Sequence, residues 1–189
     1  MEKKSLLGLL MLISIITFFA LSVSGQDNNF YYTNSGKIIF SSEAQQEIIK
    51  AESNDLRGIV DVLHKTFVFK ITIRTFTGFN SGLQQEHFNE KFLESDKYPE
   101  ASFIGKIIED IDFTRDGIYE VRAKGKLWIH GIGSERIIKS TVIVNRGKTT
   151  LESHFSVMLS DHNIKVPKVV HEKIASEINV TIIAAIKKK

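Results

Sequence analysis

Apolar and polar residues alternate along six separate stretches of this chain, most clearly over residues 117–130. Tyr119, Val121 and Leu127 belong to the apolar parity of that stretch, whereas Arg122 and Lys124 belong to the polar parity. A period of two residues predicts a β-strand with one buried face and one solvated face. At about 3.4 Å per residue this strand is long for a small sandwich, and its length suits a tilted strand in a barrel.

The remaining alternating stretches predict strands along most of the chain. Short segments rich in Gly, Asn, Asp and Ser separate them, and these residue types favour turns. One segment differs, because its apolar residues recur at helical spacing and Tyr98-Pro99 follows it. We therefore predict a short helix over 83–93, a helical turn over 167–174, and strands over 37–42, 46–53, 56–63, 65–76, 101–113, 117–130, 136–145, 148–160 and 178–186.

The order of these elements predicts the fold class. Helices do not alternate with the strands, so a parallel α/β sheet is not expected. Short turns join most neighbouring strands, which favours antiparallel, up-and-down pairing and closure of the sheet on itself. The predicted fold is all-β, an antiparallel up-and-down barrel of about eight strands with one inserted short helix.

The N-terminal residues 1–25 have the features of a signal peptide. Lys3 and Lys4 precede an apolar run from Leu6 to Ala20, and Val23-Ser24-Gly25 offers small residues for cleavage. An uncleaved membrane anchor is the alternative, because the apolar run approaches the length of a membrane span. In both cases we expect residues 26–189 to form a single exported domain, periplasmic or secreted.

The composition and motifs argue against several functions. The chain has no cysteine, which excludes disulfides, thiolate metal sites and a cysteine nucleophile. Its six histidines match no metal-ligand spacing, and neither a nucleophile elbow nor a phosphate-binding loop is present. A formal net charge of +3 gives little support for nucleic-acid binding. We expect a protein that is not an enzyme, uses no metal or cofactor and has no nucleic-acid partner.

The apolar interior is the remaining candidate for a functional site. Ala123, Gly125 and Ser153 are small at positions where a tightly filled barrel would need bulk. A barrel of eight strands is also wide enough to hold one slim ligand. The residues that we predict to line such a lumen are Phe67, Phe69, Ile71, Tyr119, Val121, Ala123, Gly125, Leu127, Phe155, Val157, Ile178 and Val180.

Three ordered motifs in this chain resemble those of the YceI-like, polyisoprenoid-binding family. The first spans 83–90 and 95–103, the second is the Gly-Lys-Leu-Trp-Ile-His-Gly of 125–131, and the third lies within 155–167. The resemblance covers about residues 36–186. It implies a lipocalin-like antiparallel barrel that is exported to the periplasm and holds a long isoprenoid-type lipid in its lumen. No catalytic residues come with it.

Three hypotheses for the function follow. The first is an exported lipid-binding protein that holds an apolar chain-like ligand, of polyisoprenoid or isoprenoid-quinone type, for transport, storage or sequestration, with transient membrane contact. The second is a ligand-free structural or interaction barrel of the cell envelope, in which side chains fill the lumen. The third is a small outer-membrane barrel, whose apolar parity would face lipid and whose charged parity would face the lumen.

Overall fold

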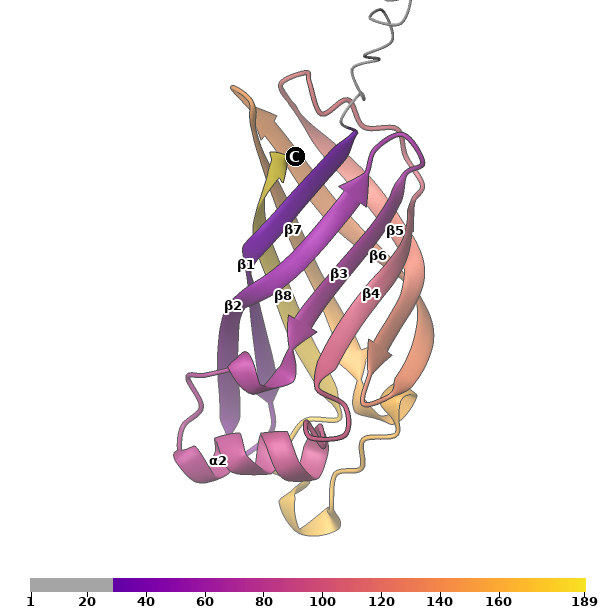
Figure 1. Ribbon diagram of the computed structural model, residues 1–189. Helices are drawn as coiled ribbons and strands as arrows, with labels where there is room; N and C mark the ends of the chain where they lie inside the picture. Colours follow the sequence, from indigo (N-terminus) through magenta and orange to yellow (C-terminus); the bar gives the residue numbers. More distant parts are fainter. Residues whose placement is uncertain (1–28) are drawn as a thin grey trace, which may run out of the picture.

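The computed structural model describes residues 29–189, which form a closed antiparallel barrel of eight strands (Figure 1). Each strand pairs with the next one along the chain, and the last strand pairs with the first, which closes the sheet. The predicted fold class is therefore confirmed. The segment predicted as a signal peptide lies outside the described residues. The strands are β1 (Phe30–Glu43), β2 (Ile48–Asp61), β3 (Thr66–Thr72), β4 (Glu100–Ile107), β5 (Gly117–Ile129), β6 (Ile132–Asn145), β7 (Lys148–Met158) and β8 (Glu177–Lys188).

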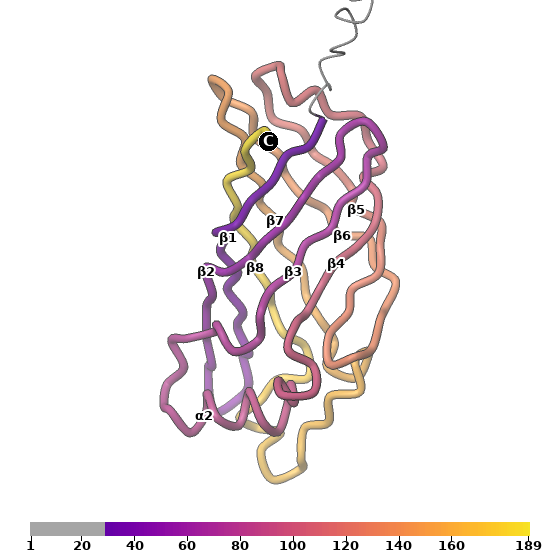
Figure 2. The backbone as a smooth tube through the Cα atoms, in the orientation of Figure 1, coloured from indigo at the N-terminus to yellow at the C-terminus, as the bar shows by residue number. Residues whose placement is uncertain are grey.

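Short helical segments lie at one end of the barrel, and both the start of β1 and the C-terminus lie at the other (Figures 1 and 2). The predicted helix over 83–93 is present, and the hydroxyl of Ser81 caps its first turn by accepting a hydrogen bond from the Gln84 amide. Within 29–189 no helix has the length and apolar character needed to cross a membrane. The helical segments are η1 (Ile73–Thr75), α2 (Gly82–His87), η2 (Phe88–Phe92), η3 (Leu159–His162) and η4 (Lys168–Val170).

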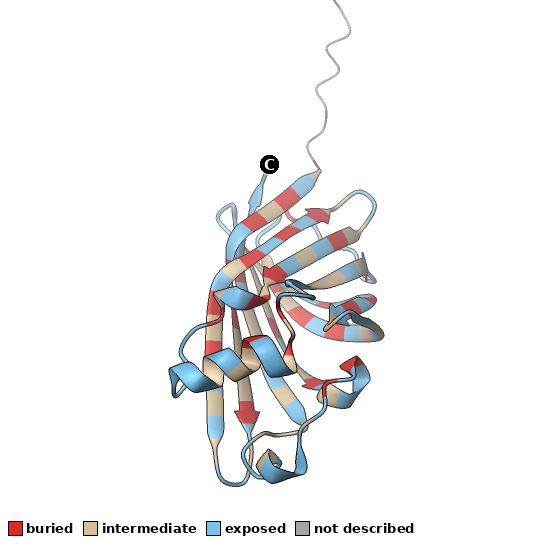
Figure 3. Ribbon diagram, turned by 60° about the horizontal axis from the view of Figure 1, so that its bottom comes forward, coloured by how far each residue is buried: buried red, intermediate tan, exposed pale blue. Residues whose placement is uncertain are grey.

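Buried and exposed residues alternate along the strands, as the sequence pattern predicts (Figure 3). On β5, Val121 and Leu127 are buried inside the barrel, whereas Arg122, Lys124 and Lys126 are exposed on its outer surface. Closure of the sheet makes all eight apolar faces share one interior. This orientation is opposite to that of a membrane barrel, whose apolar parity faces lipid, so it does not match the third hypothesis.

The structure corrects the predicted break between the strands over 46–53 and 56–63. β2 continues through these residues, so the two strands predicted over 46–53 and 56–63 are one strand. The pairing of β1 with β2 shifts register on both sides of Gly36, and the Ser53 hydroxyl accepts a hydrogen bond from the Asp55 amide at 3.2 Å. The turn-forming residues therefore mark an irregularity that bends a paired strand rather than a chain reversal.

The ends of other strands also differ from the prediction. β1 begins at Phe30 instead of residue 37, β3 ends at Thr72 and β4 ends at Ile107. Beyond β3 and β4 the alternating pattern continues into loops whose apolar side chains turn inward. Phe76 and Phe113, which were predicted to end strands, are both buried. Their burial follows from packing against the barrel rather than from strand pairing.

Two glycines allow β4 and β5 to approach closely. Gly105 and Gly125 are register partners. A Cβ atom on Gly125 would lie 2.3 Å from the carbonyl oxygen of Ile104, and one on Gly105 would lie 2.1 Å from that of Lys124. Both contacts are with backbone, which cannot rotate away as a side chain can. The two positions therefore require glycine because of the strand spacing.

We expect Gly125→Ala to lower the free energy of unfolding by about 2 kcal/mol, because the added methyl group must separate two paired strands. The matched control is Gly82→Ala at the start of α2, where a Cβ atom would meet no atom within 4 Å. Its effect should stay within about 0.5 kcal/mol. Urea unfolding of both variants measures the difference, and equal stabilities would contradict this explanation of the glycine pair.

Candidate functional site: the apolar lumen

The interior of the barrel contains a cavity of about 460 Å³. This volume lies within the range of about 300–1,000 Å³ that is typical of small-molecule sites. All eight strands contribute to its wall, and most of the lining side chains are apolar. One lining residue from each strand, in chain order, is Ile38, Leu56, Phe67, Phe103, Val121, Ile138, Phe155 and Val180.

The degree of burial of the inner residues shows that side chains do not fill the lumen. Phe69, Phe155 and Val180 line the cavity, yet each is only half-buried. In a solid core, residues of this parity would be fully buried. Their remaining exposed surface faces the cavity, whereas in a filled structural module neighbouring side chains would cover it.

Ten of the twelve residues predicted to line the lumen do so. Tyr119 does not, because it packs toward the end of the barrel and its hydroxyl donates a hydrogen bond to the carbonyl oxygen of Arg115 at 2.9 Å. Gly125 does not, because it faces Gly105, and its small size serves strand approach rather than lumen volume. The ten that line the cavity are Phe67, Phe69, Ile71, Val121, Ala123, Leu127, Phe155, Val157, Ile178 and Val180.

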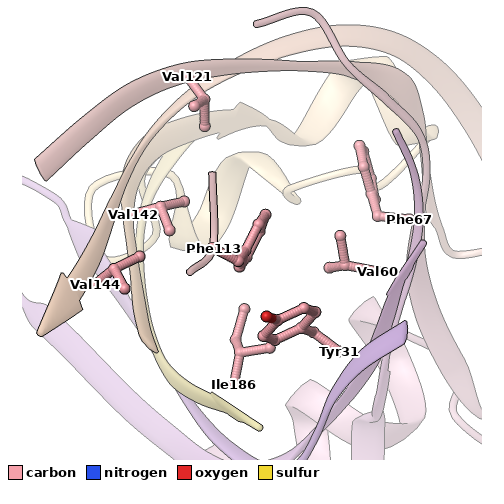
Figure 4. Packing of buried hydrophobic residues seen from close by; sticks show 8 residues of the cluster. All are labelled: Tyr31, Val60, Phe67, Phe113, Val121, Val142, Val144 and Ile186. Carbon is pink, nitrogen blue, oxygen red and sulfur yellow. The ribbon is translucent and has the colours of Figure 1, made fainter. Parts of the chain in front are cut away.

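A group of buried residues, here called the closed-end cluster (Figure 4), lies toward the end of the barrel away from α2, where β1 begins and β2 and β6 end (Figure 1). Phe113 reaches it from the loop between β4 and β5, and its ring centroid lies 4.6 Å from that of Tyr31. Burial raises the pKa of Tyr31, and nearby Asp112 adds to the rise, so the phenol stays neutral. The closed-end cluster consists of Tyr31, Val60, Phe67, Phe113, Val121, Val142, Val144 and Ile186.

Two carboxylates anchor the loop that carries Phe113. Glu109 accepts hydrogen bonds from both the backbone amide and the Nε atom of Arg122, at 2.6 and 2.7 Å. Asp112 accepts bonds from the amide and the hydroxyl of Thr114, at 2.9 and 2.6 Å. These bonds lower the pKa of each carboxyl group. The two carboxylates therefore bind the loop most strongly when they are ionised.

The opposite end of the cavity has polar residues in its wall, and we call it the mouth. Glu47, Gln84, His87 and Lys173 line the cavity there. The Nε2 atom of Gln84 donates to Oε1 of Glu47 at 2.6 Å, which joins α2 to the turn between β1 and β2. Ligands that carry a polar group could therefore reach polar side chains at this end of the cavity.

Hydrogen bonds also join this turn and the end of β1 to the segment before β8. The amide of Gln46 donates to the carbonyl oxygen of Glu172 at 2.8 Å, and the side chains of these two residues also contact each other. The amide of Ala175 donates to the hydroxyl of Ser42 at 2.9 Å. Three segments that are distant in the sequence are thus joined around the mouth.

Four phenylalanines form an aromatic collar between the mouth and the lumen. The rings of Phe40 and Phe88 are stacked with centroids 5.3 Å apart, and Phe79 lies 5.1 Å from Phe88. Phe76 packs against Phe40 at 5.4 Å. All four side chains line the cavity. Sequence reasoning missed this collar because its members come from three separate places, namely β1, the loop between η1 and α2, and η2.

The histidine of the second motif has a structural position. His130 and Gly131 both have positive φ angles, 51° and 73°, as a two-residue turn between β5 and β6 requires. The Nε2 atom of His130 lies 2.5 Å from Oε2 of Glu94, and its Nδ1 atom lies 3.2 Å from the carbonyl oxygen of His162, which is 1% exposed. The three residues hold the end of η2, the turn and η3 together. Over residues 29–189 no three His, Asp or Glu side chains gather as a metal site.

A closed antiparallel barrel with an apolar lumen and helical segments at one end is a lipocalin-like binding barrel. The family model of the YceI-like domain matches residues 19–185 of this chain, so the chain belongs to the YceI-like family. No curated protein matches the sequence.

Solved structures share this fold at low sequence identity. Burkholderia cenocepacia BcnA is 15% identical with a TM-score of 0.66, over 79% of this chain and 95% of its own. A polyisoprenoid binding domain from Saccharophagus degradans, implicated in plant cell wall breakdown, is 10% identical with a TM-score of 0.69, over 86% and 100%. The Campylobacter jejuni YceI protein is 18% identical with a TM-score of 0.57, over 74% and 85%.

The anchoring of the Phe113 loop predicts a pH dependence of stability. The Arg122 bonds hold the pKa of Glu109 below its ordinary value of 4.5, so ionised Glu109 stabilises the folded state above that pH and the stabilisation disappears as the pH falls through the lowered pKa. We expect Glu109→Gln to be less stable than the wild type at pH 7 and the gap to narrow on acidification to about pH 3. Urea unfolding at both pH values measures the gap, and a gap that does not change with pH would contradict this role of Glu109.

Proposed function

We propose that this protein is an exported lipid-binding protein that holds one apolar, chain-like molecule of polyisoprenoid or isoprenoid-quinone type in its lumen, for transport, storage or sequestration. The observation that carries the proposal is the apolar cavity of about 460 Å³ inside a closed barrel. The name of the Saccharophagus degradans domain supports the ligand class. The pattern of residues 1–25 supports export to the periplasm or beyond the cell.

Burial of hydrocarbon provides the driving force for binding. At about 25 cal/mol per Å², roughly 400 Å² of buried ligand surface contributes on the order of 10 kcal/mol, before the costs of ordering the ligand are subtracted. A charged group would lose its hydration in the apolar part of the cavity. We therefore expect any charged group of a ligand to remain at the mouth, near His87 and Lys173.

We infer that the mouth contacts a membrane while the ligand is transferred. Ile48, Leu83 and Val169 are 56%, 59% and 89% exposed, and their elements lie at the mouth end of the barrel (Figure 1). Apolar side chains around the opening of a lipid-filled lumen could insert into the interfacial region of a bilayer. The ligand would then pass between the bilayer and the lumen with little exposure to water.

Filling the lumen should abolish binding while the barrel remains folded. We expect Ala123→Phe, which adds a ring to the cavity wall, to weaken binding of a fluorescent polyprenol analogue at least tenfold, because the ring occupies volume that the chain needs. Titration of the analogue, followed by its fluorescence, measures the affinity, and the far-UV circular dichroism spectrum reports whether the barrel has formed.

The matched control for this variant is Ala185→Phe, which places the same ring on the exposed face of β8. It should bind the analogue as the wild type does. Equal affinity of a folded Ala123→Phe variant and this control would mean that the ligand does not occupy the lumen.

Removing apolar side chains at the mouth should slow transfer without changing affinity. We expect the double variant Leu83→Gln/Val169→Gln to extract the polyprenol analogue from anionic vesicles several-fold more slowly than the wild type, because both side chains would otherwise enter the bilayer. Stopped-flow fluorescence measures the rate, and equilibrium titration measures the affinity.

The control is Leu63→Gln/Ile118→Gln, which removes two side chains of 68% and 72% exposure at the opposite end of the barrel. Its transfer rate should equal that of the wild type. If both double variants slow transfer equally, the mouth is not the membrane-contacting end.

A further inference from the structure

Two serines interrupt the apolar wall near the middle of the barrel. Ser140 on β6 and Ser153 on β7 are register partners, and their hydroxyl oxygens lie 2.7 Å apart. The two residues are 7% and 5% exposed, and both line the cavity. Apolar lining residues from the same and the neighbouring strands surround the pair, namely Val121, Ile138, Val142, Leu151, Phe155 and Ile182.

The hydrogen bonds of this pair are incomplete. Two hydroxyl groups carry two protons, and the bond between them uses one. Across residues 29–189 neither hydroxyl has a second hydrogen bond, so one donor in an apolar wall has no acceptor. A buried donor without a partner destabilises the folded protein, and such groups are uncommon in native structures.

A second hydroxyl pair in the same barrel shows the completed arrangement. The hydroxyl oxygens of Ser53 and Thr75 lie 2.6 Å apart, and the Thr75 hydroxyl donates to the carbonyl oxygen of Thr72 at 2.6 Å. That pair does not line the cavity. The unused donor therefore distinguishes the Ser140–Ser153 pair, which faces the lumen, from the Ser53–Thr75 pair.

We propose that Ser140 and Ser153 form a subsite for one neutral oxygen atom of the ligand, in a carbonyl or hydroxyl group. This inference rests on the proposed function, because it concerns a ligand in the same lumen. The oxygen is neutral because the neighbours of the pair within residues 29–189 that line the cavity beside it are apolar, and an ion there would lose its hydration. The cavity continues from the pair toward the aromatic collar and the mouth, and the hydrocarbon chain of the ligand would lie there.

Two C20 isoprenoids that differ by one oxygen test the subsite, the alcohol phytol and the hydrocarbon phytane. Each displaces the fluorescent polyprenol analogue from the wild type and from Ser140→Ala/Ser153→Ala. Removing both hydroxyls leaves no orphan group, so the variant should fold normally. We expect the affinity for phytol to fall about tenfold and that for phytane to change less than twofold. For each ligand, the affinity of the variant is divided by that of the wild type. Comparing this ratio between phytol and phytane cancels the difference in how water solvates the two ligands.

The control is Ser160→Ala/Ser176→Ala, which removes two exposed hydroxyls and should change neither affinity. A carbonyl analogue labelled with ¹³C gives an independent readout, since its infrared stretch should shift to lower frequency in the wild type and return in the lumen variant. Equal losses for phytol and phytane, or no loss for phytol, would overturn the subsite while leaving the carrier proposal intact. If neither ligand displaces the analogue from the wild type, and the analogue itself does not bind, the proposed function fails and the subsite fails with it.

Discussion

The pairing of β8 with β1 is the interaction on which the rest of this structure depends. It satisfies the backbone groups of both edge strands and makes eight apolar faces share one interior. An open sheet with the same alternation could bury its apolar face only against another layer. In the closed form the circumference of the barrel sets the interior volume, and the side chains on the inner face do not fill it. The cavity is therefore a consequence of closure combined with the sizes of the inner residues.

The two ends of the barrel give the cavity a direction. At one end Phe113 packs beside Tyr31, and hydrogen bonds to Glu109 and Asp112 keep its loop in place. At the other end the aromatic collar leads to a mouth whose rim is joined by hydrogen bonds between distant segments. We therefore propose the end that contains polar side chains as the entrance for a ligand. The same end exposes the apolar residues that we assign to membrane contact.

Which residues of each strand point into the barrel could be predicted from the sequence, because the alternation of apolar and polar residues is a local property. The ten predicted residues that line the cavity follow directly from this alternation. The alternation does not indicate which strands approach most closely. It therefore predicts that Gly125 lines the lumen, whereas this glycine allows β5 to contact Gly105 on β4. It also does not distinguish a bulge from a turn at Ser53, or a strand from a loop that folds back at Phe113. Ser140 was missed because its importance comes from pairing with Ser153 on the next strand, which only the register between β6 and β7 reveals.

The central claim is that the lumen holds an apolar molecule, and the most direct measurement is the native mass of the protein isolated from its own cells without detergent. The account predicts a mass above that of the polypeptide by one ligand, which is released on denaturation and appears in an organic extract as an apolar isoprenoid-type lipid. A native mass equal to that of the bare chain, with an empty extract, from protein that also takes up no isoprenoid when one is supplied, would contradict it.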